Sequence, residues 1–289
     1  MTEPILKIEN LSHVYAPGTP FELAAVKDVN IEIYPGEVLG IIGHTGSGKS
    51  TLIQHLNALI KPTSGRVLLN GRDIHDSKQS IKEVRGKVGL VFQYPEYQLF
   101  EETIYKDIAF GPKNMKLPED EIDRRVRDAA RFVGLDAELL ERSPFDLSGG
   151  QKRRVAIAGV IAMLPQVLVL DEPMAGLDPQ GREEIMENIL TYHRETGAAI
   201  VIVTHSMEEA AKHAHRMIVM NKGSVAMDGT PEEIFSHGPE LRAMGLAVPE
   251  MTSLADRLKE LGVTLPGTVY TVEQMKAALL TLERGRADA

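Results

Sequence analysis

The chain has 289 residues, of which 43% are hydrophobic and 25% charged, a balance typical of a soluble globular protein of about two domains. Its net charge of −9 argues against general attraction to nucleic acid or to an anionic membrane surface, and the absence of cysteine excludes disulfides and thiolate chemistry. The N-terminus lacks the basic and apolar regions of a signal peptide, and no apolar run reaches the roughly 20 residues that cross a bilayer, so any membrane role requires a membrane partner.

The first predicted elements are antiparallel strands. Residues 6–9 and 29–33 alternate apolar and polar side chains, as strands do when one face meets water. Tyr15 lies in the turn-rich stretch between them, where its position suits a partly buried loop tyrosine or an aromatic ring that stacks on a purine equally well. A further strand is predicted at residues 66–71, so these segments form an antiparallel attachment at the N-terminal side of the core.

Residues 43–50, Gly-His-Thr-Gly-Ser-Gly-Lys-Ser, form a P-loop motif between a buried strand at 38–42 and a helix predicted at 51–60. The glycines let consecutive backbone N–H groups turn toward phosphate oxygens, and the helix N-terminus faces the same phosphates. Lys49 places a positive charge against the β- and γ-phosphates, and the Ser50 hydroxyl can bind Mg²⁺. His44 occupies a variable position of the motif, and we expect no catalytic role for it.

The segment after the P-loop helix is predicted to leave the sheet and form a helical insertion. A buried strand at residues 88–92 ends at Gln93, and an aromatic, turn-prone stretch follows at 94–100. A helix with acidic residues in its first turn begins near residue 118 and carries an apolar stripe that ends at Gly134. The arginines of this helix are expected on a solvated face.

The sequence Leu-Ser-Gly-Gly-Gln at residues 147–151 opens a long apolar helix that is predicted to reach Leu164, where Pro165 stops it. Buried strands are then predicted at 167–170 and 199–204, followed by Asp171-Glu172 and His205 respectively. Residues 217–227 predict a closing hairpin.

Three predicted strands thus end in polar side chains, and in open α/β sheets ligands bind at the carboxyl ends of the strands. Gln93, Asp171, Glu172 and His205 are therefore expected to converge on the phosphates that the P-loop holds. Asp171 suits the Mg²⁺ shell, Glu172 is placed to orient and activate the attacking water, and His205 to contact the γ-phosphate.

From about residue 240 the chain becomes helical. Leu254, Leu258 and Leu261 form one helical stripe, and Thr271 with Gln274 forms a capping box that opens a second helix with Met275, Leu279 and Leu282. This segment is predicted to be a small helical appendix.

With Leu147 to Gln151 in this context, the sequence resembles the nucleotide-binding subunits of ATP-binding cassette (ABC) transporters over roughly residues 4–235. The resemblance implies the α/β fold of P-loop ABC ATPases, with a RecA-like core, an antiparallel β subdomain and a helical subdomain that carries the family's signature, residues 147–151. The ATPase domain is expected at residues 1–238, its helical subdomain at about 94–164, and a helical extension at 239–289 that helps pair two ATPases.

The resemblance also implies roles for individual residues. Glu172, His205 and Gln93 are the expected catalytic residues, and Ser50, Gln93 and Asp171 are the expected Mg²⁺ ligands. Residues 175–178 are implied as the D-loop. The residues expected to contact ATP are Tyr15, Gly43, His44, Thr45, Gly46, Ser47, Gly48, Lys49, Ser50 and Thr51, together with Ser148, Gly149, Gly150 and Gln151, which in the family contact the ATP of the opposite subunit.

Within the ABC family, residues 92–100 and 107–112 resemble the ATPases of energy-coupling factor (ECF) transporters, which import vitamins or, in related systems, cobalt and nickel ions. This resemblance implies ATP hydrolysis coupled to transport and a peripheral position at the cytoplasmic face of the cell membrane. The implied partners are a second ABC ATPase, a transmembrane coupling subunit and a membrane substrate-binding subunit, with no nucleic acid. The second ATPase is another copy or a similar chain, and the ECF resemblance favours the heterodimer.

Three other functions agree less well with the sequence. A soluble ABC protein acting on ribosomes or DNA typically has two cassettes or a long coiled-coil insertion, and this sequence has neither. The ATPase of a conventional ABC importer often adds a β-rich regulatory domain, whereas the segment after residue 239 is predicted to be helical. A small-molecule kinase with a P-loop does not explain residues 147–151.

Overall fold

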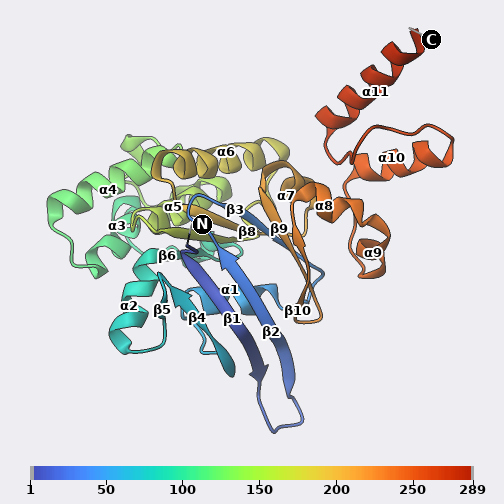
Figure 1. Ribbon diagram of the computed structural model, residues 1–289. Coiled ribbons are helices and arrows are strands. Elements are labelled where there is room, and N and C mark those ends of the chain that lie inside the picture. Colours follow the sequence, from blue (N-terminus) through green and yellow to red (C-terminus); the bar gives the residue numbers. More distant parts are fainter. Residues whose placement is uncertain (1–2, 288–289) are drawn as a thin grey trace.

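A computed structural model describes residues 3–287 of the chain. Two sheets form its centre, and helices cover the larger one (Figure 1). The larger sheet has the strand order β10-β9-β3-β8-β7-β6. Its strands are β3 (Val38–Ile42), β6 (Val88–Val91), β7 (Val167–Asp171), β8 (Ala199–Val203), β9 (Arg216–Asn221) and β10 (Ser224–Gly229).

The larger sheet is parallel except at one edge. Strands β9, β3, β8, β7 and β6 pair in parallel, and β10 pairs antiparallel with β9 in the predicted hairpin. Every residue of β3, β7 and β8 is buried, as expected for parallel strands covered on both faces. The predicted strands are therefore confirmed, and β9 has the additional role of extending the sheet beside the P-loop strand.

The smaller sheet is antiparallel, with the order β2-β1-β4-β5, and it lies below the larger sheet in Figure 1. Its strands are β1 (Leu6–Tyr15), β2 (Leu23–Ile33), β4 (Ser64–Leu69) and β5 (Arg72–Asp73). Leu6 pairs with Ile33 and Ile8 pairs with Ile31, so β1 and β2 both place apolar side chains on the buried face of this sheet. The predicted antiparallel attachment is confirmed, but β1 runs on to Tyr15, which ends a strand rather than lying in a turn.

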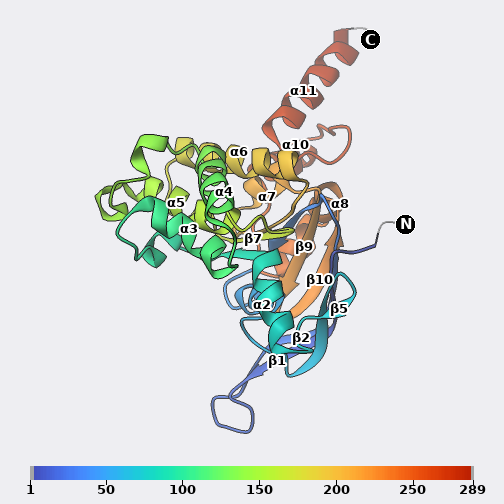
Figure 2. The same cartoon turned by 90° about the vertical axis from the view of Figure 1, so that its left-hand side faces the viewer.

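The helices form three groups. Helices α1 (Lys49–Leu56), α2 (Lys78–Lys87), α6 (Pro179–Thr196), α7 (Met207–His213) and α8 (Pro231–Ser236) pack around the sheets. The helical subdomain contains the 3-10 helices η1 (Pro95–Gln98), η2 (Ala137–Leu139) and η3 (Pro144–Asp146), with α3 (Ile104–Asn114), α4 (Glu119–Phe132) and α5 (Gly149–Ile161). Helices α9 (Gly238–Ala243), α10 (Glu250–Glu260) and α11 (Val272–Ala287) follow, and Figure 2 shows α11 projecting away from the body.

Two predicted helices end early. The P-loop helix stops at Leu56 instead of residue 60, because Ala58 adopts a positive φ of 53° and the Asn57 amide turns to donate to the carbonyl of Val88. The helix after residues 147–151 stops at Ile161, and Leu164 has a φ of 54° before Pro165. The predicted face of α4 is confirmed, since Ile122, Val126, Ala129 and Val133 are buried.

The C-terminal segment packs in two steps. Leu241, Leu246 and Val248 belong to a buried cluster with α7, α8 and β9, whereas the cluster of α10 and α11 is separate. The division at 238/239 therefore stays a prediction. The predicted capping box forms: the backbone N–H of Gln274 donates to Thr271 Oγ1, and the backbone N–H of Thr271 donates to Gln274 Oε1.

The predicted leucine stripe on α10 is wrong for two of its three members. Leu254 is 41% exposed and Leu261 is 68% exposed. The side chains that face α11 are Met251, Ala255 and Leu258, spaced i, i+4 and i+7. Leu279 of the second helix is also exposed, and Met275 and Ala278 fill the contact instead.

Candidate functional site

The P-loop connects β3 to α1 and has a shape that glycine alone permits at two positions. A Cβ atom at Gly43 would lie 2.5 Å from the carbonyl oxygen of Met220, and one at Gly48 would lie 2.4 Å from that of Ala25. Gly48 also has a φ of 101°. The turn of the β9–β10 hairpin supports the loop from outside, since the N–H of Gly223 donates to the carbonyl of Ser47 at 3.0 Å.

Lys49 folds back over this loop. Its Nζ donates to the carbonyl of Gly43 at 2.6 Å and to that of His44 at 3.1 Å. Burial lowers the pKa of Lys49, and the nearby carboxylates of Glu172 and Asp171 oppose that shift by favouring the ammonium. A phosphate would offer this half-buried cation an anionic partner in place of two neutral carbonyls.

Asp171 ends β7 beside the first turn of α1. The Ser50 hydroxyl donates to Asp171 Oδ2 at 3.3 Å. Burial raises the pKa of Asp171, the charge of Glu172 raises it further, and Ser50 and Lys49 counteract the shift. Mg²⁺ prefers oxygen ligands, and the Ser50 hydroxyl and the Asp171 carboxylate lie side by side. Burial penalises the negative charge of Asp171 when no cation compensates it, so these residues fit that ion.

Glu172 and His205 form a direct pair at the ends of β7 and β8. His205 Nδ1 lies 2.7 Å from Glu172 Oε1, with the imidazole exposed and the Glu172 side chain largely buried. An ionised carboxylate only accepts, so Nδ1 carries the proton. Glu172 has a φ of 50°, a conformation that costs of order 1–3 kcal/mol and that clusters at functional sites.

These residues line one cavity of about 760 Å³. Tyr15 stands at its rim, with its hydroxyl 3.3 Å from Thr51 Oγ1 and its ring edge-on to His13 at a centroid distance of 4.5 Å. The predicted residues that line the cavity are Tyr15, Thr45, Gly46, Gly48, Lys49, Ser50, Thr51, Gln93, Asp171, Glu172 and His205. The convergence expected from the strand ends is therefore present in the structure.

Other predicted residues lie beside the cavity or far from it. His44 faces the hairpin, with Nε2 at 3.3 Å from Asn221 Oδ1. Gly43 and Ser47 do not line the cavity, and Ser47 is fully buried. Lys27 of β2 and Lys222 of the β9–β10 turn also line the cavity, and they were not predicted from the sequence because neither belongs to a recognisable motif.

Ser148 to Gln151 lie at the N-terminus of α5, away from this cavity. Ser148 caps the helix, since its Oγ accepts from the N–H of Gln151 at 3.3 Å and Gln151 Oε1 accepts from the N–H of Ser148 at 3.1 Å. A Cβ atom added at Gly149 or Gly150 would meet no neighbouring segment within 4 Å. This helix end is therefore open to a ligand. The chain thus presents two separate surfaces suited to phosphate.

Known proteins resemble this chain over most of its length. A family model described as ABC transporter matches residues 26–175. The energy-coupling factor transporter ATP-binding protein EcfA2 of Clostridium tetani is 56% identical over 98% of both chains. The chain belongs to the ATP-binding proteins of energy-coupling factor transporters, within the ABC transporter family. Its activity is ATP hydrolysis by an ABC ATPase that serves an ECF-type importer.

Further relatives agree with this ABC ATPase assignment. The EcfA2 protein of Clostridium perfringens is 55% identical over 96% of this chain and 98% of its own. The structure of cbiO1 from the same organism, described as part of the ABC transporter complex cbiONQ, has a TM-score of 0.75 with 41% identity, covering 90% of this chain and 98% of that one. An ATP-binding cassette solved as a post-hydrolysis dimer with ADP and Pi has a TM-score of 0.70 with 30% identity, over 78% of this chain and 98% of that one.

Proposed function

We propose that this chain drives the import of a vitamin or a transition-metal ion such as cobalt or nickel, as the peripheral ATPase at the cytoplasmic face of a membrane complex. The observation that carries the catalytic part is the cavity in which Lys49, Asp171, Glu172 and His205 converge. Among residues 3–287 no helix has the length and apolar character needed to span a bilayer.

The cavity residues have the following proposed roles. Lys49 binds the β- and γ-phosphates of ATP, and Tyr15 stacks on the adenine. Ser50, Asp171 and Gln93 would hold Mg²⁺, which when bound neutralises charge on the phosphates. Glu172 orients the attacking water and accepts its proton. His205 contacts the γ-phosphate, and its 2.7 Å hydrogen bond also holds the Glu172 carboxylate in place.

A second ABC cassette completes the site in this proposal. Ser148 and the N–H groups that follow it present a helix N-terminus suited to a γ-phosphate, yet they lie outside the cavity of their own chain. A head-to-tail pair brings the signature of one subunit to the P-loop of the other. The pair is a homodimer or, favoured by the family, a heterodimer with a similar ATPase, and the extension after residue 239 helps to join it.

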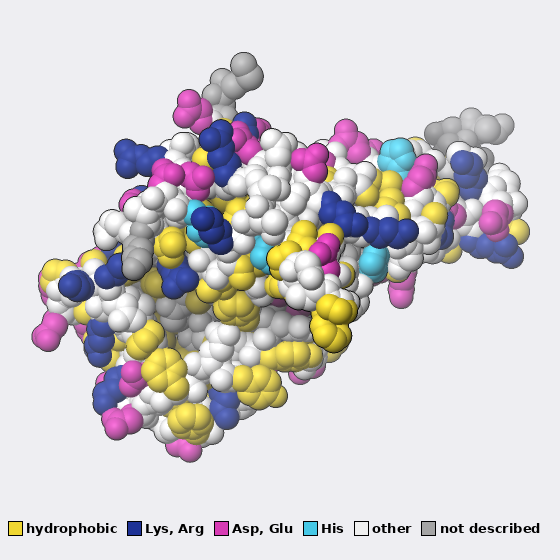
Figure 3. Space-filling model, turned by 90° about the horizontal axis from the view of Figure 1, so that it is seen from below, with side chains coloured by type: hydrophobic (Ala, Val, Ile, Leu, Met, Phe, Trp, Pro, Cys, Tyr) yellow, Lys and Arg dark blue, Asp and Glu magenta, His cyan; other side chains and the backbone are white. Residues whose placement is uncertain are grey.

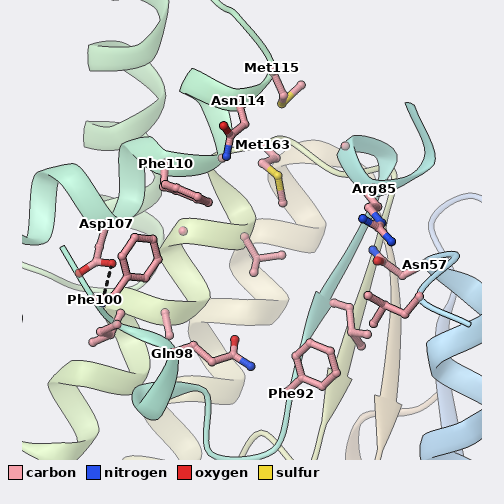
Figure 4. A pocket seen from close by; sticks show the side chains of 18 of the residues that line it. Asn57, Arg85, Phe92, Gln98, Phe100, Asp107, Phe110, Asn114, Met115 and Met163 are labelled. Carbon is pink, nitrogen blue, oxygen red and sulfur yellow. Dashed lines mark hydrogen bonds between the residues drawn. The ribbon is translucent and has the colours of Figure 1, made fainter. Parts of the chain in front are cut away.

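The membrane coupling subunit is proposed to dock in a groove of about 750 Å³ between the core and the helical subdomain (Figure 4). Phe92 and Arg85 line one wall of the groove, and Phe100 and Phe110 line the other. The rings of Phe100 and Phe110 pack edge to face, with their centroids 5.0 Å apart. Both of these phenylalanines are exposed, at 59% and 45%. Hydrophobic side chains also gather on the left of the face seen in Figure 3, the side of the helical subdomain.

The test is co-purification from membranes of the host with the bound subunits identified. The Phe100→Ser and Phe110→Ser double variant is expected to lose the membrane subunits while keeping ATP binding, because aromatic anchors commonly dominate interface energy. Phe21→Ser is the matched control, since Phe21 is 84% exposed on the β1–β2 connection and does not line the groove. Equal recovery of the membrane subunits with the double variant would place the docking surface elsewhere.

A further inference from the structure

A buried arginine connects η1, beside the docking groove, to the segment that follows Glu172. Arg153, on α5 five residues after Ser148, is 2% exposed. Its Nε and Nη2 donate to the two carboxylate oxygens of Glu96 at 3.1 and 2.9 Å, the paired geometry that gives arginine–carboxylate contacts their directionality. The remaining nitrogen, Nη1, donates to the backbone carbonyls of Pro173, at 3.2 Å, and Ala175.

The segments joined in this way lead to the nucleotide cavity from two sides. Glu96 lies in η1, three residues after Gln93 and between the groove-lining residues Phe92 and Gln98. Pro173 directly follows Glu172, and its carbonyl is one of the two that Arg153 holds. One guanidinium therefore connects the groove, the start of the signature helix and the segment after the catalytic carboxylate.

The aromatic ring of Tyr94 packs beside this connection. Tyr94, which precedes η1, has a φ of 55°, and the Arg153 guanidinium lies 5.9 Å from the centroid of its ring. A side chain at Gly176 would meet the same ring at 4.0 Å. Packed networks with directional hydrogen bonds transmit displacement better than solvated contacts, because their members cannot move independently.

We infer that Arg153 is a positioning residue that couples η1 to the loop carrying Glu172, so that a shift of the groove wall changes the placement of the catalytic carboxylate. This inference rests on the proposed docking groove for its biological purpose. The coupling itself is a property of the single chain and can be measured without any membrane subunit.

The experiment uses the absence of native cysteine. Tyr97→Cys, at a position that is 85% exposed in η1, is labelled with an environment-sensitive fluorophore, and the full chain is titrated with ATP and Mg²⁺. In the labelled chain we expect a fluorescence change that saturates with ATP. Arg153→Lys keeps the positive charge but loses the paired hydrogen bonds of the guanidinium, so it is expected to abolish the fluorescence change. Its ATP affinity, measured by equilibrium dialysis, is expected to stay within about twofold of that of the parent.

Kinetics provide a second readout. Arg153→Lys and Glu96→Gln are each expected to lower kcat about two- to thirtyfold with little change in KM, the range found for substitutions along coupled networks. Because both remove the same bridge, the double variant should lose no more than the more impaired single variant. Arg154→Lys is the matched control, since Arg154 pairs with Glu184 on the other side of α5 and should leave fluorescence and kcat unchanged.

Should Arg153→Lys fail to fold, judged by its thermal melt, Glu96→Gln is the more exposed partner and is expected to lose the fluorescence change in the same way. A full ATP-dependent signal in a folded Arg153→Lys or Glu96→Gln chain would overturn the inference, as would a parent without any signal or multiplicative effects in the double variant. Failure of the docking proposal alone would leave all of these results unchanged, because none of the measurements includes a membrane subunit.

Discussion

The buried histidine of the P-loop helix predicts a specific pH dependence of stability. His55 is fully buried, and its Nδ1–H donates to the carbonyl of Thr51 at 2.8 Å. Its Nε2 lies 3.3 Å from Nδ1 of His13, the ring that also packs against Tyr15. Burial lowers the pKa of His55 to about 4, with a smaller contribution from the neighbouring His13 and His75.

The sign and size of the effect follow from this pKa. In the unfolded chain the imidazole takes up its proton near pH 6.5, whereas in the folded chain it stays neutral down to about pH 4. The unfolded state therefore binds more protons in this window, and stability falls as the pH falls through it. Between pH 7.5 and pH 5 the loss from this one group amounts to about 2 kcal/mol.

The measurement is urea denaturation of the wild type and of His55→Gln at pH 7.5 and pH 5, with urea keeping the unfolded chain soluble near the isoelectric point of about 5.5. The variant is expected to be less stable at pH 7.5 but to lose about 2 kcal/mol less than the wild type on acidification. His237→Gln, at an exposed position, is the control for removing an imidazole and should follow the wild type. Equal losses for wild type and His55→Gln would refute the buried neutral histidine.

Two further predictions concern the nucleotide cavity. Glu172→Gln should retain ATP binding and lower kcat by about 10²- to 10⁴-fold, because the amide cannot accept the proton of the water; near-normal turnover would contradict the proposed base. Lys49→Ala should instead abolish productive ATP binding in an equilibrium binding assay, since the cationic contact to the phosphates is lost. Tyr15→Ala should weaken ATP affinity by about 1–2 kcal/mol while Tyr15→Phe stays nearly neutral, and an unchanged affinity in the alanine variant would make Tyr15 a purely structural residue.

The sequence predicted those parts of the molecule whose signal is local. Buried strands such as residues 38–42 and 167–170 are continuous apolar runs, and the side chains that follow them must converge because parallel strands end at one edge. The P-loop is marked by the order and spacing of its own residues, from Gly43 to Ser50. These features therefore required no knowledge of distant contacts.

Features that depend on distant contacts could not be predicted in this way. Lys152, Arg153 and Arg154 form a basic run, and nothing local indicates that the middle one is buried against Glu96 and two backbone carbonyls. The leucines of α10 mark an apolar stripe, but α11 packs on the neighbouring face instead. The position of Tyr15 in a turn-rich stretch left its role open until the pairing of β1 with β2 placed it at the cavity rim.

The proposal that catalysis requires two cassettes is central, and it rests on the separation of the P-loop cavity from the Ser148 helix end. Lys49→Ala chains and Ser148→Arg chains, each inactive alone, are mixed and assayed for ATP hydrolysis. A mixed pair contains one site with both faces intact and one with both faces broken, so activity is expected to return on mixing. ATPase activity of the wild-type chain that stays strictly first order in protein, down to concentrations at which only monomer remains, would contradict the two-cassette mechanism.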